Sequence, residues 1–478
     1  MDFYPINKIR FIELLKVKAN MNSSINKNSI KDYDNQYFLH PWEDCSNNNS
    51  DYKIINNSNG IYLFDESGKK YIDGPGGMWC VNLGYGRKEI AQEIAKQCEK
   101  LPYFSPWFST AEPSALLAKK LASLTPKDLN TVFFTTCGST ALDSAVRFVH
   151  YYFNCINKSD KKTIIAREKG YHGSTLLSAS ISGKERDKRV LDTIDNGIKF
   201  LSNVNPNLKG DITEEEWCNQ KVTELENTII EIGPNKVAAF VAEPILASGG
   251  VIIPPKGYHK KTHNICKKYD VLYISDEVVT AFGRLGHWFS SEDVFDFIPD
   301  IITCAKGLTS GYIPMGAMII SDSLINNIKK NSNNYDLLFS NGFTYSGHPI
   351  ASAAALKTIE IMEKEKILDH VRDITPYFQS RLKKLGEKYE CISDARGIGL
   401  LGCLEGYSNP LLDDKKRLEI DHQFGNMIDK AAEKRGLLVR PIINMCVFSP
   451  PLIITKTEID LMFNILDDAV SEVEKNLK

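Results

Sequence analysis

Two ionisable residues stand directly after apolar runs of the sequence, where they could take part in covalent chemistry. Lys306 follows DIITCA (300–305), and Asp276 follows VLYIS (271–275). Lysine is seldom buried unless it is paired or reactive, and a desolvated amine has a lowered pKa and attacks carbonyl carbons. A carboxylate at the end of a buried strand needs a cation or a hydrogen-bond donor as its partner. The pair predicts a nucleophilic amine near a carboxylate. The plainer alternatives are a lysine that extends to solvent and a carboxylate satisfied by loop N–H groups.

Two further strand ends carry residues that suit a flat, phosphorylated ligand. Gly138 and Ser139 follow TVFFTT (131–136) and precede a helical pattern. The start of a helix offers free N–H groups and a positive dipole end to a phosphate. Tyr171, in KGYHGST, has a ring that can stack on a flat group. An ordinary strand-to-helix turn and a packed tyrosine are the plainer alternatives.

Together, a phosphate cradle, a stacking ring, a carboxylate and an amine match the needs of one cofactor, pyridoxal 5′-phosphate (PLP). Lys306 would hold it as a Schiff base, and Asp276 would pair with its protonated pyridine nitrogen. Val278 stands two residues after Asp276. It would point to the same side of a continued strand and lie beneath the ring.

The elements that must position these residues are strands of an α/β fold. Between about residues 78 and 346, short β-rich runs alternate with helical patterns, and most runs lack polar alternation. This is typical of parallel strands buried on both faces, whose ligands bind at the carboxyl ends. The predicted strands are TVFFTT (131–136), KTIIA (162–166), KVAAFVA (236–242), VLYIS (271–275), DIITCA (300–305) and MGAMII (315–320).

Four segments are expected along the chain. Residues 1–36 are polar and weakly patterned, which favours a mobile N-terminal arm. Residues 78–346 form a large cofactor-binding domain with a mostly parallel central sheet. Residues 37–77, with two strands around a turn at 66–68, and residues 347–478 form a smaller α+β domain built from both chain ends.

Composition limits the classes of function. The 478 residues carry 58 basic and 60 acidic side chains and a net charge of −2, so no overall field favours nucleic acid or a membrane surface. No apolar stretch reaches membrane-spanning length, and the histidines lack metal-ligand spacing. The 11 cysteines include no CxxC pair, which favours free thiols in a reducing compartment, and we expect the cytoplasm.

From about residue 37 to the end, the sequence resembles the class III (ω-) aminotransferases of PLP fold type I. The motifs that carry the resemblance are DGPGGMWCVNLGYGRKEI, TTCGST, GYHGST, VAEPI, SDEVV, FGR, AKGLTSGYIPMGA, FTYSGHP and LLVRP. The last two are most similar to amine:pyruvate and ω-amino acid:pyruvate transaminases.

The resemblance implies a role for each matching residue of the cofactor site. Lys306 would be the Schiff-base lysine and proton shuttle. Asp276 would bind the pyridine nitrogen, Tyr171 and Val278 would enclose the ring, and Gly138 and Ser139 would hold the phosphate. Glu243 would lie near the ring on the substrate side, and Thr344 would reach the phosphate of a neighbouring subunit in an obligate homodimer.

The resemblance also implies a substrate side and a reaction. Arg440 is similar to the mobile arginine that binds a substrate carboxylate, and Trp79 would line the pocket with Trp107 or Phe108 of the partner chain. The implied reaction is ping-pong transfer of an amino group from an ω-amino acid or primary amine to a keto acid. Val279 stands where many relatives that use 2-oxoglutarate have Gln, which favours pyruvate as acceptor. The donor stays open among β-alanine, taurine, a diamine and a hydrophobic amine. An aminomutase or another PLP enzyme of this fold, or a non-catalytic binding protein, are the alternatives.

Overall fold

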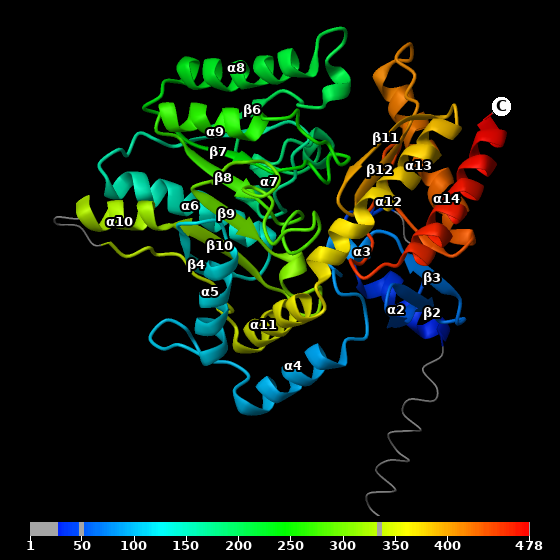
Figure 1. The fold of residues 1–478 in the computed structure, drawn as a ribbon, viewed down its shortest axis with the longest axis horizontal. Coiled ribbons are helices and arrows are strands. Elements are labelled where there is room, and N and C mark those ends of the chain that lie inside the picture. The colour runs from blue at the N-terminus through cyan, green and yellow to red at the C-terminus, as the bar shows by residue number, and fades with distance from the viewer. Residues whose placement is uncertain (1–26, 47–51, 332–336, 478) are drawn as a thin grey trace, which may run out of the picture. The chain divides into compact units, whose positions relative to one another are not determined.

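The computed structural model describes residues 27–46, 52–331 and 337–477 (Figure 1). Contacts within the chain divide it into two compact units, which are described separately. The smaller unit comprises the described parts of Met1–Asn57 together with Leu63–Lys70. The larger unit comprises Ser58–Tyr62 and the described parts of Tyr71–Lys478.

The smaller unit contains helix α2 (Lys27–Tyr37) and parts of strands β1 (Ile55–Asn59) and β2 (Tyr62–Asp65). Asp65 closes the turn after β2 by accepting hydrogen bonds from Ser67 N at 2.9 Å and Lys69 N at 3.0 Å. The turn expected at 66–68 is therefore present. The arm expected over 1–36 lies outside the described residues as far as residue 26, and residues 27–36 are helical as part of α2.

A seven-stranded sheet organises the larger unit, in the order β4-β10-β9-β8-β7-β5-β6. Strands β9, β8, β7, β5 and β6 run parallel to one another, so their carboxyl ends meet at one edge. All six predicted strands are present, and a short strand, β6, was not predicted. The bounds are β4 (Leu129–Thr135), β5 (Thr163–Arg167), β6 (Ile198–Leu201), β7 (Val237–Ala242), β8 (Leu272–Asp276), β9 (Ile301–Cys304) and β10 (Gly316–Ser321).

One strand departs from the predicted parallel pattern. β10 is antiparallel to both of its neighbours, β4 and β9. The connection from β9 to β10 spans only residues 305–315 and contains a single short 3₁₀ turn, η3 (Lys306–Leu308). A parallel crossover needs a dozen or more residues, usually with a helix, so the chain can return only in the opposite direction.

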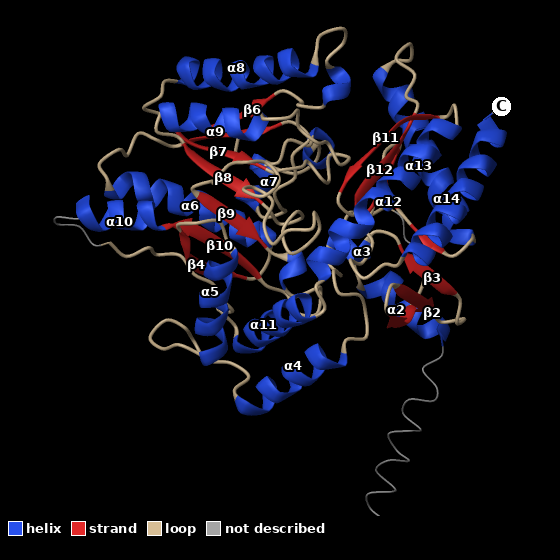
Figure 2. Ribbon diagram, viewed as in Figure 1, coloured by secondary structure: helices blue, strands red, loops and turns tan. Residues whose placement is uncertain are grey.

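Helices cover both faces of this sheet (Figure 2). On one face, α6 buries Leu142, Val146 and Val149 in a cluster that also contains strand residues Ile274 and Met318. On the other face lie α5 and α11 over one half of the sheet, and α8 and α9 over the other half. None of the helices in the described ranges is long and apolar enough to cross a bilayer. The helices between residues 71 and 364 of the larger unit are α3 (Gly76–Trp79), α4 (Lys88–Lys100), α5 (Glu112–Leu124), α6 (Gly138–Cys155), α7 (Leu176–Ile181), α8 (Glu214–Ile232), α9 (Tyr258–Lys268), α10 (Asp322–Asn331) and α11 (Pro349–Lys364).

The C-terminal part of the larger unit is built on a second sheet, in the order β11-β12-β15-β14, with antiparallel neighbours. β13 pairs in parallel with β3 (Lys70–Asp73), which brings residues 437–438 beside residues 72–73, and the smaller domain built from both chain ends stays a prediction. The predicted capping box is present, because Thr455 N donates to Glu458 at 2.9 Å. The domain boundary expected at residues 346/347 stays a prediction. α11 begins just after this point, yet it packs against α4 and α5, which come before it. The elements are α12 (Ile367–Lys388), β11 (Ile392–Ile398), β12 (Leu401–Gly406), α13 (Asp414–Lys434), β13 (Leu437–Leu438), β14 (Arg440–Ile442), β15 (Met445–Phe448) and α14 (Lys456–Leu477).

Lys161 stabilises the edge of the large sheet at which the parallel strands begin. Its buried ammonium donates hydrogen bonds to the main-chain carbonyls of Pro234, Val237, Tyr269 and Asp270, at 2.9, 3.0, 3.2 and 2.6 Å. These carbonyls lie at or just before the starts of β7 and β8, while Lys161 itself precedes β5. One cation therefore holds three strand starts, at the edge opposite to the strand ends that carry the predicted site.

We predict that Lys161→Met destabilises the fold without altering the site. Four carbonyls lose a charged donor, so the free energy of unfolding should fall by about 3 kcal/mol or more. Thermal unfolding measures the loss. Lys162→Met is the matched control, because Lys162 makes an exposed hydrogen bond to Asn154, 2.7 Å long, and should cost less than about 0.5 kcal/mol. Equal melting temperatures for the two variants would contradict the stabilising role.

Candidate active site

Lys306 and Asp276 lie at the carboxyl ends of neighbouring strands. Asp276 is the last residue of β8 and pairs in register with Thr303 of β9, and Lys306 follows β9 after one residue. Burial lowers the pKa of the Lys306 amine, while the nearby Asp276 and Glu243 carboxylates oppose that shift. The lowered pKa increases the fraction of neutral amine near neutral pH, which is the nucleophilic form.

Trp79 faces the amine of Lys306. The Lys306 Nζ atom lies 5.2 Å from the centroid of the Trp79 ring. Both residues have left-handed backbone conformations, with φ of 40° at Lys306 and 61° at Trp79. Such strain in residues other than glycine is common at functional sites, where the surrounding fold holds it in place. The Trp79 side chain is buried, and its indole N–H has no hydrogen-bond partner among the described residues.

The Asp276 carboxylate is buried and held by three donors. His172 Nδ1 lies 2.7 Å from Oδ2, and Val278 N and Thr303 Oγ1 each lie 3.2 Å from Oδ1. Only 4% of the Asp276 side chain is exposed, so solvent contributes little to its stabilisation. No lysine or arginine forms an ion pair with it in the described part of the chain. A buried carboxylate with this environment suits a cationic group of a ligand.

The start of α6 lies against the segment after β8. A Cβ atom added to Gly138 would be 3.0 Å from both methyl groups of Val278, so only a glycine leaves these two residues in close contact. Ser139 Oγ accepts a hydrogen bond from Ser174 N at 3.1 Å, which ties the first turn of α6 to the GYHGST segment. The structure thus brings together the predicted phosphate cradle, Val278 and the loop that carries Tyr171.

Glu243 positions Tyr171. Its Oε1 atom accepts a hydrogen bond from Tyr171 N at 2.9 Å, and its Oε2 atom accepts one from Ala247 N at 3.1 Å. Glu243 directly follows β7, and burial raises the pKa of its carboxyl group. The carboxyl therefore holds the loop after β5 beside the loop after β7.

Arg440 is the first residue of β14, in the second sheet. Its charge acts on the pKa values of both Tyr171 and Lys306, which places the guanidinium near these groups. Burial lowers its own pKa, and Arg186 lowers it further. No described residue accepts a hydrogen bond from the Arg440 guanidinium or forms an ion pair with it. It is available to an anionic ligand.

Thr344 does not join these residues within one chain. Its side chain is exposed, and its main-chain oxygen accepts a hydrogen bond from Tyr103 Oη at 2.9 Å. Trp107 and Phe108, which were expected to serve a partner's pocket, are 78% and 93% exposed. Within one chain, the predicted site residues therefore lie around Lys306 and Asp276, and the exposed Thr344, Trp107 and Phe108 do not join them.

Two residues with evident roles were not among the predicted site residues. His172 forms a hydrogen bond with Asp276. The sequence does hold a signal for this role, because His172 directly follows Tyr171 in the segment after a predicted strand. Lys184 has its Nζ atom 5.4 Å from the Tyr171 ring centroid, but it stands 13 positions further along the chain (184 − 171). Nothing in its local pattern, SISGKERDKR, shows that it returns to the site.

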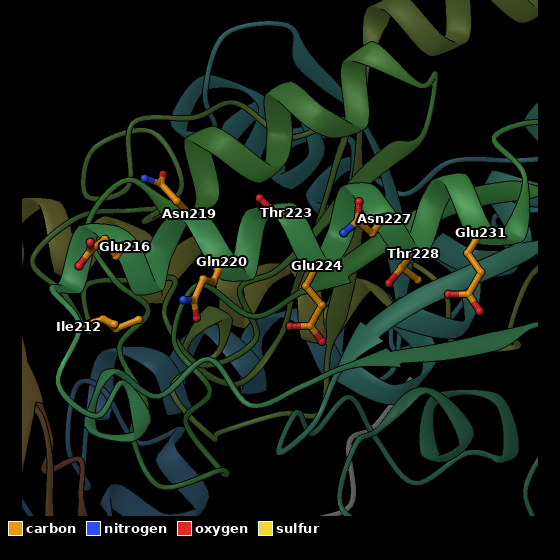
Figure 3. A pocket seen from close by; sticks show the side chains of 9 residues that line it. All are labelled: Ile212, Glu216, Asn219, Gln220, Thr223, Glu224, Asn227, Thr228 and Glu231. Atoms are coloured by element: carbon orange, nitrogen blue, oxygen red, sulfur yellow. The ribbon is translucent and has the colours of Figure 1, made fainter.

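A separate groove runs along α8, away from these residues (Figure 3). Its lining is polar and acidic and contains none of the predicted site residues. The side chains that line it are those of Ile212, Glu216, Asn219, Gln220, Thr223, Glu224, Asn227, Thr228 and Glu231. This lining contains no lysine, arginine or aromatic side chain, so the groove lacks the groups that the chemistry at Lys306 needs.

Comparison with known proteins agrees with this geometry. The family model for aminotransferase class-III matches residues 45–470. The chain is 40% identical over 432 residues to gamma-aminobutyrate transaminase 1, mitochondrial, of Oryza sativa subsp. indica, covering 89% of this chain and 82% of that protein. It is 37% identical over 451 residues to putrescine–pyruvate aminotransferase of Pseudomonas aeruginosa, covering 92% and 96%.

Solved structures show the same fold. A thermostable (S)-enantioselective omega-transaminase from Thermomicrobium roseum superposes with a TM-score of 0.88 at 31% identity, covering 94% of this chain and 99% of that one. A transaminase from the marine bacterium Virgibacillus gives a TM-score of 0.86 at 34% identity, covering 94% and 100%. The fold and the site define a PLP-dependent transaminase of fold type I. The chain belongs to the class-III aminotransferase family.

We predict that His172→Phe weakens cofactor binding, because Asp276 loses a buried donor. A hydrogen bond to a charged group contributes about 1.5–3 kcal/mol, so the dissociation constant for PLP should rise by about tenfold to a hundredfold. Titration of the apoprotein with PLP, followed by absorbance, measures this. His150→Phe is the matched control. Among the described residues, His150 forms its hydrogen bond to the Lys162 carbonyl, at 2.9 Å, and this carbonyl precedes the start of β5 at the opposite edge of the sheet. An unchanged dissociation constant in His172→Phe would show that His172 is only a packing residue.

Proposed function

We propose that this aminotransferase moves the amino group of an ω-amino acid or primary amine to a keto acid, pyruvate, by a ping-pong mechanism with PLP. The observation that carries the proposal is the Lys306 amine at the strand end next to Asp276, with the charge of Arg440 acting on both the amine and Tyr171. The names of the relatives support a donor with a terminal amine, since they include a gamma-aminobutyrate transaminase and a putrescine–pyruvate aminotransferase.

The residues present fit PLP in size and charge. Gly138 and Ser139 at the start of α6 would hold the phosphate, and the buried Asp276 carboxylate would pair with the pyridine nitrogen. Tyr171 and Val278 would enclose the ring. When bound, PLP supplies an electron sink for the carbon that loses its proton.

Residues of the chain would provide proton transfer, a charge partner for the cofactor, orientation of the substrate and exclusion of water. Lys306 would accept the proton that leaves the donor carbon, and its lowered pKa favours the neutral amine that can accept it. Asp276 keeps a proton on the pyridine nitrogen by charge pairing in a buried setting, where water screens it little. Arg440 orients the substrate carboxylate, and Trp79 with its apolar neighbours keeps water from the reacting atoms.

The choice of pyruvate is supported by the wall that contains Val279. Val279 packs with Trp79, Ile245 and Leu285 in one apolar cluster. The aliphatic side chains of Val279, Ile245 and Leu285 offer no donor to a second carboxylate, as in 2-oxoglutarate, which would lose its hydration against them without compensation. A keto acid with a single carboxylate avoids this cost.

We further propose that the working enzyme is a homodimer. Thr344, Trp107 and Phe108 are exposed in one chain, and the resemblance to the family assigns all three to a neighbouring subunit's site. Large exposed aromatic rings of this kind are typical of interfaces. Light scattering should give about twice the mass of one chain. Thr344→Ala should weaken PLP binding, while a monomeric, fully active protein would exclude this arrangement.

The cytoplasm remains the proposed compartment. All 11 cysteines are free, which fits a reducing environment. Fluorescence microscopy of the full chain with a C-terminal fluorescent tag tests this, and accumulation in an organelle would exclude it.

We predict that Lys306→Ala abolishes turnover. The purified parent protein should be yellow and bleach when a donor amine is added, whereas the variant should lack this response. Loss of the proton-transferring amine should reduce the rate by at least about 10²–10⁴-fold. Absorption spectra and alanine formation from pyruvate provide the two readouts. A variant that continued to form alanine would overturn the assignment of Lys306.

We predict that Arg440→Ala separates donors by their charge. The bleaching rate measures the first half-reaction alone, before any keto acid binds. Donors with a carboxylate should lose about tenfold to a hundredfold in this rate at low concentration, because a charge-assisted interaction of about 1.5–3 kcal/mol is removed. Alkylamines should change by less than about twofold. Equal losses for both kinds of donor would contradict the carboxylate-binding role.

A further inference from the structure

Lys184 is a largely buried cation beside the cofactor-facing ring. It lies just before the short 3₁₀ turn η1 (Glu185–Lys188), and 11% of its side chain is exposed. Its Nζ atom is 5.4 Å from the Tyr171 ring centroid and donates a hydrogen bond to Ser248 Oγ at 2.7 Å. A strongly hydrated ammonium is rarely placed so close to a reaction site without an electrostatic purpose.

The charge of Lys184 is only partly balanced by the protein. Asp187 is its nearest carboxylate, with Oδ2 at 3.8 Å, and Asp187 Oδ1 already accepts a hydrogen bond from Arg186 Nε at 2.9 Å. Burial lowers the pKa of Lys184 to about 8, and the positive charges of Arg186 and Arg440 add to that shift. At pH 7 the group is still mostly protonated, so three cations, Lys184, Arg186 and Arg440, outnumber the two carboxylates that act on Lys184, those of Asp187 and Glu243.

Glu243 relieves this excess of positive charge only in part, by raising the pKa of Lys184. Both of its carboxylate oxygens accept main-chain hydrogen bonds, from Tyr171 N and Ala247 N. Burial raises its pKa, which favours its neutral form. The surroundings of Tyr171 therefore carry a positive potential, and the Arg440 guanidinium, which has no acceptor among the described residues, is available to an anion there.

We propose that Lys184 is a specificity-determining residue that, with Arg440, selects amine donors that carry an acidic group at the end remote from the amine. The proposal rests on the proposed transaminase function and narrows its donor from amines in general to ω-amino acids. An acid bound at Arg440 lies in the field of Lys184 across the Tyr171 ring. The second ammonium of a diamine would instead meet three like charges in a poorly hydrated site.

Three four-carbon amines isolate this effect. 4-Aminobutyrate, butylamine and 1,4-diaminobutane share the reacting amine and differ at the far end, which is anionic, neutral and cationic respectively. The bleaching rate of the PLP-loaded protein with each donor measures the first half-reaction. In Lys184→Gln, the rate constant for 4-aminobutyrate at low concentration should fall about tenfold, butylamine should change less than twofold, and 1,4-diaminobutane should react faster.

Three further variants keep the test decisive. Asp187→Asn adds net positive charge without touching Lys184, so it should raise the ratio of 4-aminobutyrate to 1,4-diaminobutane rates, opposite to Lys184→Gln. Lys188→Gln is the matched control on the same turn, where Lys188 donates to the Ser180 carbonyl at 3.0 Å, and it should leave the ratio unchanged. If Lys184→Gln proves unstable, Lys184→Arg retains the charge and should retain the acid preference.

A binding measurement separates this proposal from the reaction itself. Butyrate has the acid but lacks the amine, and calorimetry gives its dissociation constant whether or not the protein turns over. Lys184→Gln should weaken butyrate binding about tenfold. If no amine bleaches the parent protein while butyrate binding still depends on Lys184, the transaminase proposal fails and the acid site stands. If both the donor ratio and butyrate binding stay within twofold of the parent in Lys184→Gln and Asp187→Asn, Lys184 has only a structural role.

Discussion

The cost of burying the Asp276 carboxylate governs the architecture around the site. Removing an ionised carboxylate from water costs several kcal/mol unless donors replace the lost hydration. Three donors do so, from the loop after β5, the neighbouring strand β9 and the second residue after β8. Each of these segments is fixed by the need to reach one carboxylate. The loops that carry Tyr171, Val278 and Lys306 are the same segments, or lie directly beside them.

The parallel sheet turns this local requirement into a site. Strands β9, β8, β7 and β5 are adjacent, and their ends carry Lys306, Asp276, Glu243 and the Tyr171 loop in that order. Neighbouring strands are about 4.8 Å apart, so the sheet spaces these groups evenly along one edge. The antiparallel β10 separates β9 from β4, and α6 begins beyond the end of β4. The start of α6 nevertheless reaches Val278, just after β8, so the predicted phosphate cradle lies on the same edge as Lys306 and Asp276.

The sequence predicts most of this arrangement, because the strand ends carry local signals. An apolar run followed by a lysine, or by Asp and Glu, shows both the strand and the chemistry at its end, and the six predicted runs are all strands. The direction of β10 was missed because direction depends on the length of a connection and not on the composition of the run. Lys184 was missed for a different reason. Its role comes from a return of the chain to the Tyr171 ring, and a single sequence contains no signal for such a tertiary contact. The partners of Asp276 lie 104 and 27 positions away, so they too become visible only in the fold.

Arg440 belongs to the antiparallel sheet of the C-terminal part, whereas Lys184 and Tyr171 belong to loops of the large sheet. The protein provides no ion pair of its own between the Arg440 guanidinium and those loops. An acid held by Arg440 and Lys184 together is then a bridge between the two sheets, and each turnover forms and breaks that bridge. The bound substrate would thus supply a tertiary contact between the two sheets that Arg440 does not make with the described residues of the protein.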